Sequence, residues 1–456
     1  MTMPSRDVDV VICSSRDRDL RPDAEESPPV ALLDRALLRD SLRRAIAGAS
    51  RESRAVGILS IGLRGFDEVA RRCGRDFVEN ALKLIGERLL ATVRRTDTVV
   101  RLDDSEFIIV QVRIEGARGC YSLARRLTRA IQVPLQVDGQ QLSPLIDVGI
   151  VVVETDDEDP ECWLQQARAV LREARTDDPG SYRCANPELD AQLQMRLRLE
   201  RELCQALAGE QLVLHYQPIV KLVSRHVAGF EALLRWQHPT RGLLMPHDFL
   251  QVAEDSGLIV QLGSWVLHQA CHDAVSWPRM AKVATNVSLV EFRHSCFADT
   301  VRNALLSTGL DPSRLVIEIG EETLSRLNER ALPTLHSLKS LGVGIVMDDF
   351  GMGRSSLNQL QAFPFTGVKI DHSLMARAES QESAAAFVRA VISIGRSFGL
   401  KVTAEGVETE RQLRFLNKEG CEQVQGYYFS RPMPSREIDR LITLIELQSQ
   451  QRHQAE

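Results

Sequence analysis

Polar residues recur at regular intervals along the second half of the chain, each at the end of a short apolar run. From Asn286 to Gln425 the steps between them are 32, 30, 21, 36 and 20 residues, each about the length of one strand plus one helix. Carboxylate oxygens are ligands that suit Mg²⁺ and Mn²⁺. If the residues converge, the sequence predicts a divalent-metal site among Glu231, Asn286, Glu318, Asp348, Asp349, Lys369, Glu405 and Gln425.

The adjacent acids Asp348 and Asp349 could bridge two ions. Two divalent ions about 3.5–4 Å apart can activate a water molecule and stabilise an in-line displacement at phosphorus. Each residue also has a simpler interpretation, since a single Glu after a strand is often a helix cap or a surface charge, and Lys369 alone could be a solvated or paired lysine. The regular spacing of the whole set favours one shared site that acts on a phosphodiester.

These residues can meet only if the elements bring the strand ends together. Eight apolar runs alternate with amphipathic helical segments after the first two, which predicts an α/β fold closed as a (β/α)8 TIM-like barrel. In such a barrel the carboxyl ends of the strands converge on the catalytic face. The runs are Leu212–His215, Val227–Phe230, Lys282–Thr285, Leu315–Ile319, Gly344–Met347, Gly367–Ile370, Lys401–Ala404 and Val424–Phe429.

The chain before the barrel predicts a separate α+β domain. It contains a strand at Ala55–Ile61, a long helix at Phe66–Arg94 and a hairpin at Thr98–Val112. Pro179 and Gly180 mark a boundary near its end. The predicted organisation is a flexible tail at residues 1–30, the α+β domain at 31–185, a linker helix at 186–208, the barrel at 209–447 and a C-terminal tail at 448–456.

Composition narrows the class of protein. The 456 residues are 44 % hydrophobic and 26 % charged with a net charge of −6, which is typical of a globular chain and argues against a nucleic acid polymer as partner. There is no run of 18 apolar residues, so no membrane span is predicted. The nine cysteines form no Cys-x-x-Cys pair, and with the absence of a signal-like segment this predicts a cytoplasmic protein.

The barrel region resembles a known family. The sequence from Glu231 to Arg235 (EALLR) resembles the signature of EAL domains, the cyclic di-GMP phosphodiesterases, and the resemblance extends over about residues 197–444. It includes further motifs in the same order along the chain. These are Tyr216–Ile219, Asn286–Ser288, Ile317–Ile319, Asp348–Gly351, Val368–Asp371, Ala404–Glu408 and Gln425–Tyr427.

This resemblance implies two Mg²⁺ or Mn²⁺ ions as cofactors. It implies Glu405 as the general base, Lys369 as the group that holds the attacking water or hydroxide, and Gln425 as the residue that orients the base. The implied ligands are Glu231, Asn286, Glu318 and Asp348 for the first ion, and Asp348, Asp349 and Glu405 for the second.

The resemblance also implies contacts to the substrate. Arg235 would bind a phosphate, a task that suits its fixed fork of donors, and Gln217 would help to position the nucleotide. Glu321 would anchor the loop after Asp349, whose order in this family couples dimerisation to metal binding. A homodimer through the barrel is therefore expected.

The first domain, at about residues 32–183, resembles a GGDEF domain, the diguanylate cyclase fold. At the signature, the family's two glycines are Asp103 and Asp104, and its acid is Ser105. Side chains at glycine positions would crowd the nucleotide phosphates, and two extra carboxylates would repel a triphosphate. The family's metal-binding Asp aligns with Gly62, and its guanine-reading pair with Ala70 and Glu79. The resemblance therefore implies that cyclase activity is lost.

One motif of this family remains in the first domain. Arg94 and Asp97 match the Arg-x-x-Asp product-inhibition motif, which could bind cyclic di-GMP as a regulatory site. The simpler interpretation is a helix-terminal Arg followed by a turn Asp.

Taken with both resemblances, the sequence predicts hydrolysis of cyclic di-GMP to linear pGpG by the barrel. The first domain, inactive as a cyclase, would regulate the barrel and could bind a protein partner. The alternative is a non-catalytic cyclic di-GMP receptor or a protein-interaction scaffold. The complete metal set favours the enzyme.

Overall fold

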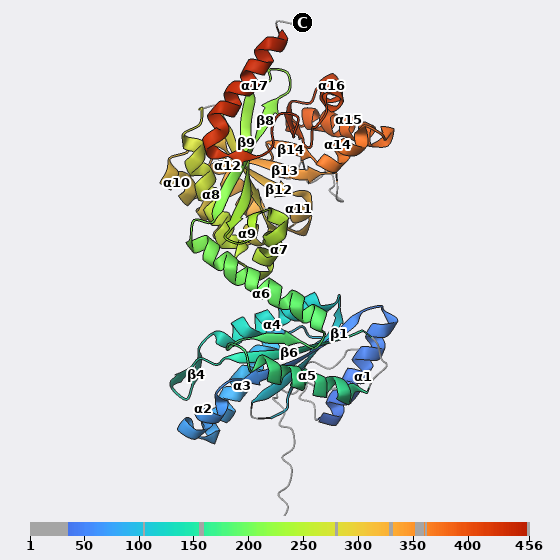
Figure 1. Cartoon of the computed structure of the whole chain (residues 1–456), viewed down its shortest axis with the longest axis vertical. Helices are drawn as coiled ribbons and strands as arrows, with labels where there is room; N and C mark the ends of the chain where they lie inside the picture. The colour runs from blue at the N-terminus through green and yellow to red at the C-terminus, as the bar shows by residue number, and fades with distance from the viewer. Residues whose placement is uncertain are drawn as a thin grey trace, which may run out of the picture. The chain divides into compact units, whose positions relative to one another are not determined.

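The computed structural model describes residues 35–103, 105–154, 159–278, 281–327, 332–351, 360 and 363–453 (Figure 1). The chain divides into two compact units, Met1–Arg198 and Leu199–Glu456. The tail predicted at residues 1–30 lies outside the described residues. The tail predicted at 448–456 is helical as far as His453, where α17 (Ile438–His453) ends.

The first unit is built around a five-stranded sheet with the order β2-β3-β1-β6-β7. The hairpin predicted around residues 103–105 is confirmed, because β2 and β3 pair antiparallel. The elements are α1 (Arg35–Arg51), β1 (Ala55–Leu63), α2 (Phe66–Cys73), α3 (Arg75–Thr92), β2 (Thr98–Arg101), β3 (Glu106–Ile114), α4 (Ala117–Gln132), β4 (Leu135–Val137), β5 (Gln140–Leu142), β6 (Ile146–Val153), α5 (Pro160–Ala174), β7 (Tyr182–Cys184) and the start of α6 (Pro187–Ala208).

The single helix predicted at Phe66–Arg94 is wrong. Gly74 separates α2 from α3, and its φ of 88° is a left-handed value that only glycine adopts without strain. The apolar pattern continues on both sides of the break, which is why periodicity alone suggested one helix. The short hairpin of β4 and β5 was also missed by the sequence analysis.

Helices cover both faces of the first sheet, so alternate residues of β1 enter different cores. Leu59 and Ile61 pack in a cluster with residues of α3 and α4, while Val56 and Ile58 pack with residues of α1 and α5. This follows from the two-residue period of a strand. It explains why every residue of β1 is buried.

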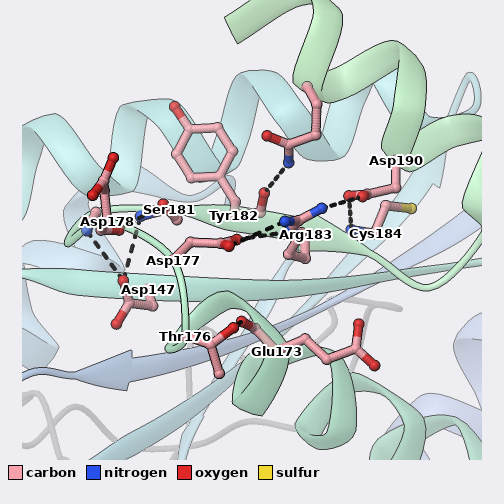
Figure 2. A network of polar contacts seen from close by, with 12 residues as sticks. Asp147, Glu173, Thr176, Asp177, Asp178, Ser181, Tyr182, Arg183, Cys184 and Asp190 are labelled. Atoms are coloured by element: carbon pink, nitrogen blue, oxygen red, sulfur yellow. Dashed lines mark hydrogen bonds and ion pairs between the residues drawn. The ribbon is translucent and has the colours of Figure 1, made fainter.

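A polar network closes the carboxyl end of the first unit (Figure 2). Arg183 on β7 forms two hydrogen bonds to Asp177, at 2.6 and 3.1 Å, and a third to Asp190 in the first turn of α6, at 2.9 Å. Asp190 also accepts a hydrogen bond from the amide of Cys184, at 2.8 Å. The first turn of α6 is thereby fixed to the last strand of this unit.

The second unit contains a closed barrel, as predicted. Its strand order is β9-β11-β12-β13-β14-β15-β16-β8, and β8 pairs with β9 to close the ring. The strands are β8 (Leu212–Lys221), β9 (Val227–His238), β11 (Lys282–Val287), β12 (Leu315–Gly320), β13 (Gly344–Phe350), β14 (Gly367–Ile370), β15 (Lys401–Ala404) and β16 (Gln423–Gln425).

Two details of the barrel differ from the regular βα pattern. β8 runs antiparallel to both of its neighbours, while the others that pair with each other are parallel. β9 does not end at Phe230 but continues to His238, because the long antiparallel pairing with β8 supports it. Glu231 therefore lies within a strand. The last strand is also shorter than the predicted run, Val424–Phe429.

The remaining elements of the second unit lie outside the ring. α6, whose second half contributes Leu199 and Leu203 to the barrel's core cluster, begins the unit. The others are β10 (Gly242–Leu244), α7 (Pro246–Ser256), α8 (Ile259–Val275), α9 (Leu289–Phe292), α10 (Phe297–Thr308), η1 (Pro312–Arg314), α11 (Glu321–Leu327), α12 (Leu332–Ser340), α14 (His372–Ala378), α15 (Glu382–Ser397), α16 (Glu410–Glu419), β17 (Met433–Pro434), η3 (Ser435–Glu437) and α17.

Candidate active site

A lysine lies at the centre of the carboxylates that the sequence analysis grouped together. Lys369 Nζ is 2.5 Å from a carboxylate oxygen of Glu405, 2.9 Å from one of Glu318, 3.0 Å from one of Glu231 and 3.8 Å from one of Asp348. These residues come from five different strands or strand ends. The Lys369 side chain is 1 % exposed, so the centre of the cluster is shielded from water, while Asp348 and Glu405 lie nearer its rim.

Amide side chains hold Glu231 in place on its other sides. Asn286 Nδ2 donates to Glu231 Oε1 at 2.6 Å, and Gln425 Nε2 donates to Glu231 Oε2 at 2.6 Å. Gln425 also donates to Gln217 Oε1 at 3.1 Å, and Gln217 in turn donates to the carbonyl of Ser430 at 3.3 Å. The predicted site residues on β8, β9, β11 and β16 therefore form one connected network.

A second group of acids lies beside this network. Carboxylate oxygens of Asp348, Asp349 and Glu405 are all within 4.8 Å of one another. Asp349 has a φ of 55°, and its amide donates to Asp348 Oδ1 at 2.9 Å. A left-handed φ at a non-glycine residue is uncommon and is tolerated where the surroundings impose it. Here it places two consecutive carboxylates at one point of the site.

The charges in this cluster do not balance. Five carboxylates face one ammonium group. Burial and the carboxylates around it raise the pKa of Glu405 to about 8 despite the nearby Lys369, and burial and Asp348 raise the pKa of Asp349 to about 6. Burial also raises the pKa of Glu318 well above its usual range. The site therefore favours additional positive charge, either protons or cations.

Glu231 and Lys369 are the ionised partners of the cluster. Burial opposes the charge of Glu231, but the ammonium of Lys369 and the hydrogen bonds from Gln425 and Asn286 outweigh it and lower its pKa. For Lys369, burial is outweighed by four surrounding carboxylates, which raise its pKa well above its usual range. Lys369 therefore remains charged at any physiological pH.

The donor set fits divalent cations of the Mg²⁺ class. Hard oxygen ligands are abundant, and much of the excess negative charge is buried, where a cation or a proton would neutralise it, while Asp349 is exposed at the rim. Gln425 Oε1 is also buried without a hydrogen-bond partner among the described residues. A buried acceptor without a donor is costly, and a water molecule held in the site would satisfy it.

Two further predicted residues lie at the edge of the site. Arg235 is 6 % exposed, forms a hydrogen bond to the carbonyl of Leu234, and forms no ion pair with a described carboxylate, so its guanidinium remains available to an anionic ligand. Glu321 Oε2 accepts a hydrogen bond from the amide of Gly351 at 2.9 Å. This contact anchors the end of β13, while residues 352–359 of the following loop lie outside the described part.

Asp371 belongs to the motif Val368–Asp371, but no role was predicted for it. It is 5 % exposed, caps α14 by accepting from the amide of Ser373 at 2.9 Å, and adds to the negative charge that raises the pKa values of Asp348 and Asp349. Its position directly after β14 was the available signal.

The region of the first unit where the GGDEF resemblance places a metal and a guanine contains several of the protein's own ion pairs. A Cβ atom at Gly62 would lie 2.6 Å from the guanidinium of Arg175, which therefore fills the space of a side chain there. Arg168 Nε donates to Glu106 at 2.9 Å, and Arg101 forms a bidentate pair with Glu79 at 2.8 and 3.0 Å. Asp104 lies outside the described residues. Guanidinium groups of the protein itself thus occupy this region.

In the motif of Arg94 and Asp97, the Asp97 carboxylate forms hydrogen bonds within the first unit. The Asp97 side chain is buried and accepts hydrogen bonds from the amides of Arg94 and Val112, at 3.0 and 3.4 Å, while Arg94 is exposed. This is the arrangement of a turn-stabilising Asp.

Comparison with known proteins identifies the class. Residues 200–432, more than half of the chain, match the EAL domain family, and residues 30–179 match the family described as diguanylate cyclase, GGDEF domain. The chain belongs to the EAL domain family and carries a GGDEF domain ahead of the EAL domain.

Relatives share both domains. An uncharacterised signalling protein of Caulobacter vibrioides is 39 % identical over 412 residues, which is 90 % of this chain and 51 % of the relative. MucR of Pseudomonas aeruginosa, described as a bifunctional diguanylate cyclase/cyclic di-GMP phosphodiesterase, is 38 % identical over 89 % of this chain and 60 % of its own length. The chain thus spans about half to three-fifths of these relatives.

A solved structure supports the barrel assignment. The PaMucR phosphodiesterase in complex with c-di-GMP is 44 % identical, with a TM-score of 0.52, and covers 53 % of this chain and 99 % of that chain. Among the described residues, no helix is both long and apolar enough to cross a membrane.

Proposed function

We propose that this protein is a metal-dependent phosphodiesterase that hydrolyses cyclic di-GMP to linear pGpG in its EAL domain. The observation that carries the proposal is the set of carboxylates around Lys369, with Asn286 hydrogen-bonded to Glu231 and with Asp349 beside Asp348 and Glu405. The c-di-GMP complex of a 44 % identical EAL domain supports the substrate.

The residues divide into three tasks. Two Mg²⁺ or Mn²⁺ ions, when bound, would polarise the phosphodiester and lower the pKa of the attacking water. Arg235 binds a phosphate oxygen of the substrate, and Gln217 positions the nucleotide beside Glu231. The first ion would be held by Glu231, Asn286, Glu318 and Asp348. The second would be held by Asp348, Asp349 and Glu405.

Glu405 takes the proton of the attacking water. The water oxygen forms a bond to phosphorus while one ester P–O bond of the ring breaks, and the released oxygen takes up a proton from solvent, which gives the linear dinucleotide. Lys369, held 2.5 Å from Glu405, orients the water and keeps the base ionised once cations neutralise the neighbouring carboxylates. Gln425 fixes the surrounding network through Glu231.

The direct test is hydrolysis of cyclic di-GMP by the purified chain with Mg²⁺ or Mn²⁺, with products separated by chromatography. Glu405→Gln should reduce the rate by about 10²–10⁴, the range for loss of a general base, while binding of the substrate persists. Glu382→Gln, an exposed residue on α15, is the matched control and should be unaffected. Binding without turnover by the wild-type protein would favour a receptor instead.

We further propose that the first domain makes no cyclic di-GMP and regulates the barrel. The ion pairs of Arg168, Arg175 and Arg101 occupy the region in which a metal and a guanine would be bound. Incubation of the full chain with GTP should yield no cyclic di-GMP. A GTP-dependent product would overturn this part.

α6 is the element suited to transmit such regulation. Its first turn is fixed to β7 through Asp190, and Leu193 packs in the core of the first unit. Leu199 and Leu203 on the same helix pack in the core of the barrel. A change at either end therefore acts on one continuous helix. Dimerisation through the barrel and a cytoplasmic location belong to the same proposal.

A further inference from the structure

The barrel contains a cavity of about 190 Å³ below the carboxylate cluster. Glu318 and Lys369 line its upper part. Lys282 and Lys401, the first residues of β11 and β15, and Lys221, the last residue of β8, line its lower part. Because β8 is antiparallel to its neighbours, the three lysines lie at the same end of the barrel, opposite the catalytic face.

Four of the seven cavity-lining residues two positions before a site residue are small, whereas the other three are Val316, Val346 and Gln423. Gly229, Ala284, Gly367 and Thr403 each precede a site residue by two positions, so they face the interior and line the cavity. Barrels of this type are ordinarily filled by bulky branched residues. A Cβ at Gly229 would lie 2.5 Å from the carbonyl oxygen of Lys282, and one at Gly367 would lie 2.7 Å from that of Lys401. The backbone therefore excludes larger residues at both glycines.

Lysine is rare in this chain and concentrated at the cavity. Only seven of the 56 basic residues are lysines, and four of the seven line this space. Lysine carries a compact ammonium group on a slender stem, whereas the planar guanidinium of arginine is larger. Lys369 is buried and Lys282 is half-buried, while Lys221 and Lys401 are exposed at the lower rim, so the lower part of the cavity opens to solvent and keeps room for another group.

The lower end of the cavity has uncompensated positive charge. Neither Lys282 nor Lys401 forms an ion pair with a described carboxylate, and Lys221 forms none either. Burial and the nearby charge of Lys401 lower the pKa of Lys282, so the two ammonium groups are close enough to repel each other. Glu318, at the upper end, forms an ion pair with Lys369, with 2.9 Å between a Glu318 carboxylate oxygen and Lys369 Nζ. Like charges around a concave, partly desolvated space attract an anion.

We propose that the lower part of this cavity binds a small oxyanion of the phosphate type, between the ammonium groups of Lys282 and Lys401. Thr403 and Gln423, which also line the cavity, supply additional polar groups. Inorganic phosphate and the phosphate of a nucleotide share this chemistry. The site lies at the opposite end of the barrel from the phosphodiester site and does not depend on the proposed function.

The test uses the full chain in metal-free buffer, so that phosphate cannot bind through cations at the catalytic face. The protein is labelled with ¹³C at the lysine ε carbons, which gives seven signals, assigned by single Lys→Gln variants. Titration with inorganic phosphate at constant ionic strength should shift the signals of Lys282 and Lys401 in a saturable manner. Lys339 and Lys418, both exposed, should not shift.

Two double variants with the same charge change complete the test. Lys282→Gln with Lys401→Gln should weaken phosphate binding by at least about tenfold, since both ammonium groups that would bind the anion are removed, with Lys221 as the reporting signal. Lys339→Gln with Lys418→Gln should leave the affinity unchanged. If the first variant fails to fold, the wild-type titration decides alone.

The titrations distinguish specific anion binding from ionic screening, and a free phosphate from the phosphate of a nucleotide. A uniform, non-saturable drift of all exposed lysine signals would show ionic screening only and would overturn the proposal. Saturation by inorganic phosphate but not by GMP would identify a free anion, whereas tighter saturation by GMP would identify a nucleotide phosphate held at the mouth. Because this test does not measure hydrolysis, its result would stand even if the chain did not hydrolyse cyclic di-GMP.

Discussion

The barrel and the first domain both contain a cluster of acidic and basic side chains, but the balance of charge differs. In the barrel, one ammonium, Lys369, faces four carboxylates within 3.8 Å. In the first domain, Glu106 lies between Arg168 and Arg175, and Glu79 pairs with Arg101. The first cluster lacks positive charge, whereas the second is already neutralised by the protein.

This difference underlies the proposal that the barrel cluster binds divalent cations and the cluster of the first domain does not. In the barrel, burial and repulsion between neighbouring acids raise the pKa of Glu405 to about 8. In the first domain, the hydrogen bond from Arg101 lowers the pKa of Glu79. A raised pKa shows that a carboxylate lacks a neighbouring cation to neutralise it. A lowered pKa shows that the carboxylate already has such a partner, here an arginine. Charge balance, more than the number of acids, thus separates the two sites.

The largest expected effect comes from breaking the barrel cluster at Glu231. Glu231→Ala removes the partner of Lys369, Asn286 and Gln425 together with an expected metal ligand. We expect cyclic di-GMP hydrolysis to fall by a factor of about 10³ or more, because metal binding and base orientation are lost together. Glu322→Ala, an exposed acid on α11, is the control.

Initial rates and circular dichroism should be measured on the same preparations. A folded Glu231→Ala variant with wild-type turnover would contradict the assignment of Glu231 as a ligand, and a matching loss in Glu322→Ala would point to a surface-charge effect instead.

Deletion of residues 1–185 should have a smaller effect on the barrel. The deletion keeps α6 but removes β7 and with it the contact between Arg183 and Asp190. Coupling between sites typically corresponds to about 1–3 kcal/mol, or about 5–150-fold, so we expect kcat/KM or the oligomeric state to change measurably within that range. Identical kinetics and the same oligomeric state would show that the first domain does not regulate the barrel.

The stability of the metal-free protein should depend on pH in a defined direction. Glu405 and Asp349 have folded-state pKa values raised to about 8 and about 6, from 4.5 and 3.8. A carboxyl that binds its proton more tightly when folded stabilises the fold at low pH, and this contribution is lost as the pH rises through the folded-state pKa. The Tm should therefore fall as the pH increases from about 4.5 to 8.

Calorimetry with and without Mg²⁺ measures this effect. A difference of one pKa unit between the folded and unfolded states corresponds to about 1.4 kcal/mol of stability. For a domain of about 250 residues this shifts the Tm by about 3–5 °C. Mg²⁺ should restore the Tm at pH 8, and Glu405→Gln should flatten the dependence. A Tm that rises from pH 4.5 to 8 without metal would contradict the charge imbalance.

The sequence predicted the barrel and the clustering of its polar residues because the spacing of these residues followed the strands. Residues such as Asn286, Glu318 and Asp348 lie at or near the ends of parallel strands, so alternation and strand order place them together. The extension of β9 to His238 could not be anticipated in this way, since it depends on pairing with β8, a contact between strands of opposite direction.

Other features depend on contacts that no local pattern encodes. The helix break at Gly74 follows from a backbone angle, and a single glycine in an amphipathic segment does not fix it. The placement of Arg175 over Gly62 joins residues more than 100 positions apart. The cavity under the carboxylate cluster likewise arises where residues of separate strands meet.

The smallest expected effect comes from breaking a pair in the first domain. Arg101 is 2 % exposed, but its partner Glu79 is 43 % exposed, so solvent screens the attraction between them. Glu79→Gln should cost about 0–1 kcal/mol, the range for exposed ion pairs, which is below about 4 °C in Tm. Hydrolysis of cyclic di-GMP should be unchanged, and GTP should still give no product, because Gly62 and Asp103 remain. Differential scanning calorimetry and the two assays test this. If Glu79→Gln altered hydrolysis more than it altered stability, the pair would be part of the proposed regulatory coupling and not only a local ion pair of the first domain.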